Sequence, residues 1–239
     1  VTWHDAVGSL PITPAIFIAN EFFDALPVEQ FVRQSNGWHR RLVGLAPGGT
    51  SNKPRFVFTH AQFPHPMEDL PVAANIPADD GAIIETSPVV QQIAGEIARR
   101  IRSLSGAALI VDYGYAVPSV GDTLQAVQQH DYASILEQPG KVDLTAHVDF
   151  SALADSARSA GATCWGAITQ GEFLRRLGIE TRASALAATA APEQKTDIET
   201  ALERLIGGDR MGTLFKVLAI GPRTANPPAG FLLEETKLN

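Results

Sequence analysis

Cysteine is nearly missing from this sequence, which has one, Cys164, in 239 residues. A single cysteine excludes a disulfide bond within the chain and a zinc site built from several thiolates. So few thiols indicate a reducing compartment. The sequence also lacks an apolar run approaching the roughly 18 residues of a membrane-spanning helix, and its first residues show no signal peptide. We therefore expect no membrane span and, from the alanine-rich composition, a bacterial cytoplasmic protein.

Basic residues are also few, because 19 lysines and arginines stand against 26 aspartates and glutamates, for a net charge of −7. This balance argues against a nucleic-acid groove, which needs clustered positive charge, and it suits a cationic substrate. The sequence has no Gly-x-Ser-x-Gly elbow and no Walker loop. His60 and His65 lack the i, i+4 spacing of a helical ligand pair, so we expect no metal site.

What the sequence does contain is the pattern of a parallel α/β sheet. Residues 15–19 and 107–111 are short, continuous apolar runs, which are typical of buried parallel strands. Between them, residues 88–103 repeat apolar side chains at helical spacing, with Ser87 as the predicted N-cap. Strand, helix and strand in this order predict a βαβ unit. Polar residues follow both strands, at the sheet edge where ligands bind in open α/β sheets.

An antiparallel insertion is predicted within this unit. Residues 28–32 and 40–45 are rich in strand formers, and Asn36-Gly37 between them is a strong hairpin signal. The other predicted elements are a strand at 55–59, a connecting insertion at 121–140, helices at 151–160, 170–177 and 193–206, an alanine-rich helical pattern at 181–196, and a last strand at 214–220.

A cluster of polar side chains follows the first predicted strand. Asn20, Glu21 and Asp24 lie before Pro27, which prevents a longer helix there. Two carboxylates and an amide at a sheet edge would form an anionic pocket that can hold a guanidinium group by bidentate hydrogen bonds. The alternative is that Asp24 caps a helical turn and that Glu21 is simply solvated.

Two further polar clusters lie later in the chain. Asp112 follows the second predicted strand and is either part of the same pocket or a turn-forming residue before Gly114. In residues 141–150, Asp149 is a natural N-cap for the helix that follows. His147 is a candidate base, with a purely structural histidine as the alternative.

Taken as a set and in order, these segments resemble the motifs of the MidA-like methyltransferases. The similarity spans nearly the whole chain, and its first and fifth motifs are the most specific. The motifs are residues 20–28, 85–88, 109–115, 122–126, 143–150, 170–174 and 211–218.

The resemblance implies a class I, Rossmann-like α/β fold that uses S-adenosylmethionine. Mitochondrial members of this family assist the assembly of respiratory complex I and are associated with methylation of an arginine in one of its subunits. The implied partner is therefore a protein arginine side chain, and the implied compartment of a eukaryotic member is the mitochondrial matrix. The resemblance places Asn20 and Glu21 beside the methyl group of the cofactor and 112–114 at the next strand end. Together with the clusters above, the predicted site residues are Glu21, Asp24 and His147 for catalysis, Asn20 for the cofactor, and Asp112, Tyr113 and Gly114 for the substrate.

The chain departs from the family pattern at its beginning. Family members carry a glycine-rich loop after the first strand and an acidic residue that holds the ribose. Nothing before Ala15 supplies either feature, and Gly48-Gly49 lies between hairpin strands. We therefore interpret residues 1–239 as the carboxyl-terminal portion of one methyltransferase domain, with insertions at about 28–80 and 115–148.

Two other functions remain compatible with this sequence. A non-catalytic assembly or binding module could keep the fold without the complete cofactor site, and the missing glycine loop favours it. A small-molecule methyltransferase is the other alternative. The predicted hairpin argues against the latter, since a free sheet edge could bind a peptide.

Overall fold

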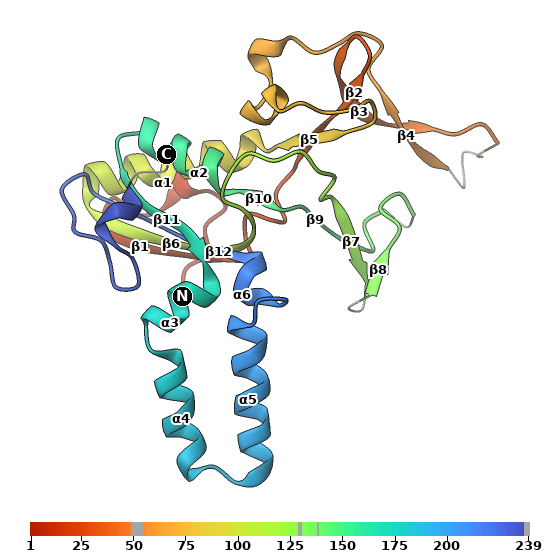
Figure 1. Ribbon diagram of the computed structural model, residues 1–239. Helices are drawn as coiled ribbons and strands as arrows, with labels where there is room; N and C mark the ends of the chain where they lie inside the picture. Colours follow the sequence, from red (N-terminus) through yellow and green to blue (C-terminus); the bar gives the residue numbers. More distant parts are fainter. Residues whose placement is uncertain (49–54, 129–130, 138, 237–239) are drawn as a thin grey trace. The chain divides into compact units, whose positions relative to one another are not determined.

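The computed structural model describes residues 1–48, 55–128, 131–137 and 139–236 (Figure 1). The chain forms two compact units. The first comprises Val1–Phe23, Val90–Val117 and Val148–Asn239, and the second comprises Asp24–Val89 and Pro118–His147. The insertions predicted at 28–80 and 115–148 fall almost entirely within the ranges of the second unit. That both units belong to one methyltransferase domain stays a prediction.

The first unit is built on a mixed sheet with the strand order β1-β6-β12-β11. Strands β1 (Ala15–Asn20) and β6 (Gly106–Tyr115) are parallel, whereas β12 (Phe215–Gly221) is antiparallel to β6, and β11 (Thr163–Thr169) is antiparallel to β12. The short strand β10 (Val148–Asp149) also pairs with β6. The predicted parallel pair with a helix in its connection is confirmed, and β6 continues four residues beyond its predicted end.

Helix α1 (Pro88–Leu104) lies in the connection between the two parallel strands and confirms the predicted helix. Its buried side chains share one face. The chain then turns at Ser105 and Gly106, which both have positive φ, at 66° and 124°. A Cβ atom on Gly106 would lie 2.0 Å from the carbonyl oxygen of Ala15. Only glycine therefore lets β6 start this close to β1.

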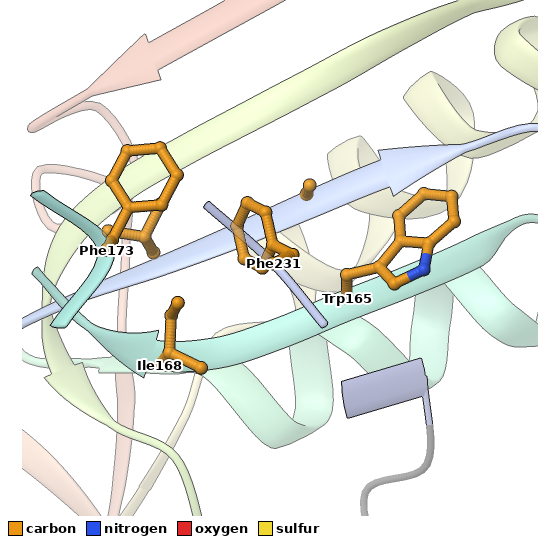
Figure 2. Packing of buried hydrophobic residues seen from close by; sticks show 6 residues of the cluster. Trp165, Ile168, Phe173 and Phe231 are labelled. Atoms are coloured by element: carbon orange, nitrogen blue, oxygen red, sulfur yellow. The ribbon is translucent and has the colours of Figure 1, made fainter. Parts of the chain in front are cut away.

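The core of the first unit contains a cluster that joins β11, β12 and helix α3 (Gln170–Arg176) (Figure 2). Trp165, Phe173 and Phe231 are its large members, and they are at most 8% exposed. Helix α2 (Phe150–Ser159) packs against the same sheet. Strand β11 was missing from the sequence-based prediction. Its ladder shifts register between Trp165 and Ile168, which removes the alternating pattern by which a strand is recognised.

Two helices project from the sheet of the first unit (Figure 1). After Gly178, at φ 83°, α4 (Ile179–Thr189) runs outward and α5 (Pro192–Ile206) runs back, and the short α6 (Met211–Leu214) follows. We call α4 and α5 together the helical arm. The helical pattern predicted at 181–196 is confirmed except at Ala190 and Ala191, where the chain is extended before Pro192 begins α5.

Where the structure describes it, the second unit contains two small antiparallel sheets. The predicted hairpin is confirmed, but its two turn residues are Ser35 and Asn36, and Gly37 already pairs with Gln34. The predicted connecting insertion contains strands, which were missed because each has at most four residues. One sheet has the strand order β4-β3-β2-β5, and its strands are β2 (Glu29–Gln34), β3 (Gly37–Leu45), β4 (Phe56–His60) and β5 (Ile83–Thr86). The other sheet has the order β8-β7-β9, and its strands are β7 (Gln125–Gln128), β8 (Asp131–Ala133) and β9 (Asp143–Thr145).

The remaining elements of the described residues are short 3-10 helices at Val7–Ser9, Met67–Asp69, Val72–Asn75 and Leu233–Thr236. None of the helices in the described part of the chain has the length and apolar composition needed to cross a membrane. Gly49, half of the glycine pair noted in the sequence, lies outside the described residues.

Candidate functional site

The candidate site of the first unit lies where β1 ends. Asn20 is the last residue of β1 and pairs with Val111 of β6. The next amide, of Glu21, donates to the Val111 carbonyl at 3.0 Å. Glu21 has a φ of 48°, in the left-handed region, which costs a non-glycine residue on the order of 1 kcal/mol. The chain therefore makes a sharp turn at this residue, directly at the sheet edge.

A buried carboxylate holds this turn in place. Asp112 is fully buried, and its Oδ2 atom accepts hydrogen bonds from the backbone amides of Phe22, at 3.2 Å, and Phe23, at 3.0 Å. Its Oδ1 atom accepts from the amide of Tyr113 at 3.0 Å. Amide donors stabilise the charged form of a buried carboxylate. Asp112 thus fixes the backbone that presents Glu21, while its predicted contact with substrate stays a prediction.

Two polar side chains are exposed on top of the turn. Asn20 and Glu21 are both exposed, and the amide nitrogen Nδ2 of Asn20 donates to Oε1 of Glu21 at 3.3 Å. Phe22 is 45% exposed and packs edge-on against the buried Phe23, with ring centroids 5.1 Å apart. A carboxylate next to an amide, beside an aromatic ring, can bind and orient a planar cationic group such as guanidinium.

The end of β6 is fixed from two sides. Gly114 pairs with Val148 of β10, and a Cβ atom on Gly114 would lie 2.1 Å from the Val148 carbonyl oxygen. From the other side, the ammonium group of Lys216 donates to the Gly114 carbonyl at 3.0 Å. The same ammonium donates to the carbonyls of Thr213, at 2.6 Å, and Leu214, at 3.1 Å. Burial lowers the pKa of Lys216 below its ordinary value.

Lys216 was not predicted as a site residue. It lies within the motif at 211–218, which is the signal that could have identified it. Tyr113, between Asp112 and Gly114, packs its ring against Phe215 with centroids 5.5 Å apart. The structure therefore brings Asn20, Glu21 and the segment 112–114 together at one edge of the first unit's sheet.

Asp24 and His147, the other two predicted catalytic residues, belong to the second unit. Asp24 is 5% exposed, and its carbonyl accepts from the amide of Ala146 at 3.0 Å. The amide of His147 donates to the Thr123 hydroxyl oxygen at 2.9 Å. The structure thus places Asp24 beside the segment that ends in His147. Their catalytic roles stay predictions.

A buried glutamate supports that segment. Glu85 is 3% exposed, accepts from the backbone amide of Thr123 at 3.1 Å and also bonds the Thr123 hydroxyl. Gln30 donates to the same carboxylate at 2.6 Å. Thr123 therefore links the buried Glu85 to the backbone of His147. Among the described residues, no three His, Cys, Asp or Glu side chains are grouped so that they could hold a metal ion.

Asp149 is the N-cap of α2, as predicted. Its Oδ1 atom accepts from the amides of Ser151 and Ala152, both at 3.0 Å. We expect Asp149→Ala to lower the free energy of unfolding by about 1 kcal/mol, measured by urea denaturation. Asp149→Asn, which keeps a capping oxygen, should retain most of this stability. A large loss of activity at unchanged stability would show that Asp149 acts in the site and not as a cap.

Comparisons with known proteins place the chain in a family and agree with the sheet described above. A family model described as "Putative S-adenosyl-L-methionine-dependent methyltransferase" matches residues 1–168. The mitochondrial protein arginine methyltransferase NDUFAF7 of Danio rerio is 34% identical over 221 residues, which are 92% of this chain and 50% of that protein. The Drosophila melanogaster homolog has the same identity and coverage. The chain therefore spans about half the length of the curated relatives it matches.

A solved structure is also similar, and it is described as a "likely methyl transferase from Burkholderia thailandensis bound to S-adenosyl-homocysteine". It superposes with a TM-score of 0.79 and 28% sequence identity, over 96% of this chain and 58% of that one. The predicted α/β fold class is confirmed by this match and by the mixed sheet of the first unit.

Proposed function

This chain belongs to the family of S-adenosylmethionine-dependent methyltransferases, and we propose on that basis that the whole protein methylates arginine side chains of a partner protein. The curated relatives are named protein arginine methyltransferases, which supports this acceptor. The similar Burkholderia thailandensis structure holds S-adenosyl-homocysteine, the product that remains after methyl transfer. The observation that carries the proposal is the exposed Glu21, held beside Asn20 in a strained turn at the edge of the sheet.

Glu21 is suited to bind the acceptor. A guanidinium group can donate two hydrogen bonds to one carboxylate, and such charge-assisted pairs are geometrically specific. In the proposed reaction the arginine nitrogen forms a bond to the methyl carbon, the carbon–sulfur bond of the sulfonium breaks, and the sulfur keeps the electron pair. The methylated nitrogen releases one proton to water, so that the product is a methylguanidinium group and a neutral thioether. Because the carboxylate fixes the plane of the guanidinium, it directs one nitrogen at the methyl group and reduces the entropy that orientation costs.

The described residues fit one flank of the cofactor. A bound S-adenosylmethionine supplies the electrophilic methyl group. The strand end at Asn20 is the kind of position where ligands bind in open α/β sheets, and the exposed amide of Asn20 can bond a polar edge of the cofactor.

The proposed target is a subunit of respiratory complex I, which is the partner that the resemblance to MidA-like methyltransferases implies. For the compartment we propose the bacterial cytoplasm, or the mitochondrial matrix of a eukaryotic source. The single cysteine, Cys164, is a free and buried thiol, which fits a reducing compartment.

The test uses the whole protein with S-adenosylmethionine labelled in its methyl group. Complex I subunits that contain arginine should take up label, and amino-acid analysis should recover it as methylarginine. The same subunits with the modified arginine replaced by lysine should take up none. Cofactor binding without transfer would favour a non-catalytic module, and label on free metabolites alone would favour a small-molecule methyltransferase. Either result would exclude the proposed function.

A further inference from the structure

The helical arm of the first unit has an apolar face that the described chain leaves uncovered. Helix α4 has no buried residue, and α5 buries only Ile206. Leu177, at the end of α3, and Leu186, on α4, are 49% and 48% exposed. In this arm the apolar side chains of both helices line one open groove, and helices in water gain most of their stability from packing such a stripe.

The uncovered face forms a groove of about 420 Å³ that runs along α4 and α5. Each helix contributes a stripe with the spacing i, i+3, i+4 and i+7, as in helices that pack against another helix. The stripes are Ile179, Arg182, Ala183 and Leu186 on α4, and Ile198, Ala201, Leu202 and Leu205 on α5.

We propose that this groove is covered by the helical arm of a second copy of the chain, so that two arms form a four-helix bundle around a twofold axis. The spacing of the stripes is that of bundle helices. With the two arms parallel, α4 of one copy packs on α5 of the other. The same surface of each copy then forms the contact, as a twofold-symmetric interface requires, and the apolar stripes of both arms become buried.

Two alanines, one on each helix, lie at nearly the same distance from the base of the arm, as the parallel packing of two arms requires. Ala183 is five residues after Gly178, at the base of the arm, and Ala201 is six residues before Gly207, where the chain returns to the base. At 1.5 Å per residue these positions are roughly 8 and 9 Å from the base. In parallel arms, the two alanines therefore face each other across the interface, and their small side chains let the helices approach closely.

Charge complementarity supports a second copy as the occupant. Arg182 is the charged residue in the groove lining, and it makes no ion pair with a carboxylate in the described part of the chain. Helix α5 carries four carboxylates and two cations, so it is acidic overall. Packing α4 on the α5 of the partner places each Arg182 beside this acidic helix. Electrostatic complementarity of this kind favours one arrangement over others.

The size of the arm predicts a weak dimer. Helix α5 has 15 residues and is therefore about 22 Å long, and two helices side by side are about 20 Å wide. The face that they present, roughly 400 Å², is about half of a standard interface per partner. We therefore expect a dissociation constant in the micromolar range.

Sedimentation analysis of the protein over a concentration series from about 1 μM to 1 mM tests this inference. The protein should shift from monomer to dimer within the series. Leu186→Glu should weaken association at least tenfold, because it places a charge in the bundle core. The control is Ala188→Glu, which adds the same charge two residues away on the exposed side of α4 and should dimerise normally. A monomer throughout the series, or equal effects of the two variants, would overturn the proposal.

A crosslinking experiment tests the arrangement without adding charge to the groove. Chains with Ala183→Cys and chains with Ala201→Cys are mixed and oxidised with glutathione disulfide. We expect a disulfide-linked pair of unlike chains. The native thiol does not compete, because burial raises the pKa of Cys164 to about 11. Replacing the first variant by Ala188→Cys should abolish the product. If both mixtures gave equal yields, the proposed interface would be wrong.

Discussion

Replacing Glu21 by glutamine is expected to lower methyl transfer by the whole protein at least tenfold while its thermal midpoint stays nearly unchanged. The glutamine side chain has the same size but no charge, so it would lose the charge-assisted hydrogen bonds to the proposed guanidinium acceptor, which are worth roughly 1.5–3 kcal/mol. The midpoint should not change because Glu21 is exposed and its turn is held by backbone amides that donate to the Val111 carbonyl and to the Asp112 carboxylate.

Initial rates with S-adenosylmethionine and the protein substrate measure this effect. Asp5→Asn is the control, since Asp5 is an exposed carboxylate far from Glu21 in the sequence, and its turnover should equal that of the unmodified protein. Calorimetric titration with S-adenosyl-homocysteine separates cofactor binding from transfer, and its dissociation constant should change less than the rate. Turnover of Glu21→Gln equal to that of the control would remove Glu21 from the active site.

The parts of the fold that could be predicted are those whose signal is local. Strand β1 and helix α1 lie within single runs of apolar spacing, and Gly106 follows the helix as its stop. The position of Glu21 could be predicted as well, because a polar residue after a buried strand is visible in the sequence. The positive φ of Glu21 could not be predicted, because that conformation depends on the hydrogen bonds that join the turn to Val111 and Asp112 of the neighbouring strand.

The parts that were missed depend on residues far apart in the chain. The hydrogen bonds from Phe22 and Phe23 to Asp112 join positions about 90 residues apart, so they exist only because β1 and β6 are parallel neighbours. In the same way, Lys216 contacts Gly114 across 102 residues. Spacing alone made Asp112 a candidate turn residue or pocket carboxylate. The register shows that it lies inside β6, one residue beyond the pairing partner of Asn20.

This placement of Asp112 leads to the largest expected loss of stability. Asp112→Ala removes a fully buried carboxylate and leaves the amides of Phe22 and Phe23 without it as an acceptor. Each buried donor that loses its partner costs about 1–3 kcal/mol. For the two amides together we expect the free energy of unfolding to fall by about 2–6 kcal/mol, which urea denaturation measures. The control is Asp155→Asn, whose exposed carboxylate pairs with Arg158 at 3.2 Å and should cost less than about 1 kcal/mol. Equal losses from the two variants would contradict the role assigned to Asp112.

The milder variant Asp112→Asn tests whether Asp112 acts through Glu21. Its amide oxygen can still accept from the Phe22 and Phe23 amides, but its NH2 group then faces the donor of Tyr113. We expect this variant to fold, with a turn less firmly held and slower methyl transfer. If Asp112 contributes to the rate only by positioning Glu21, both variants remove the contribution of the Glu21 carboxylate to the rate. The double variant of Asp112→Asn and Glu21→Gln should then lose less activity than the product of the two single losses. Fully multiplicative losses would mean that the two carboxylates act independently, and Asp112 would then need a contact with the substrate of its own.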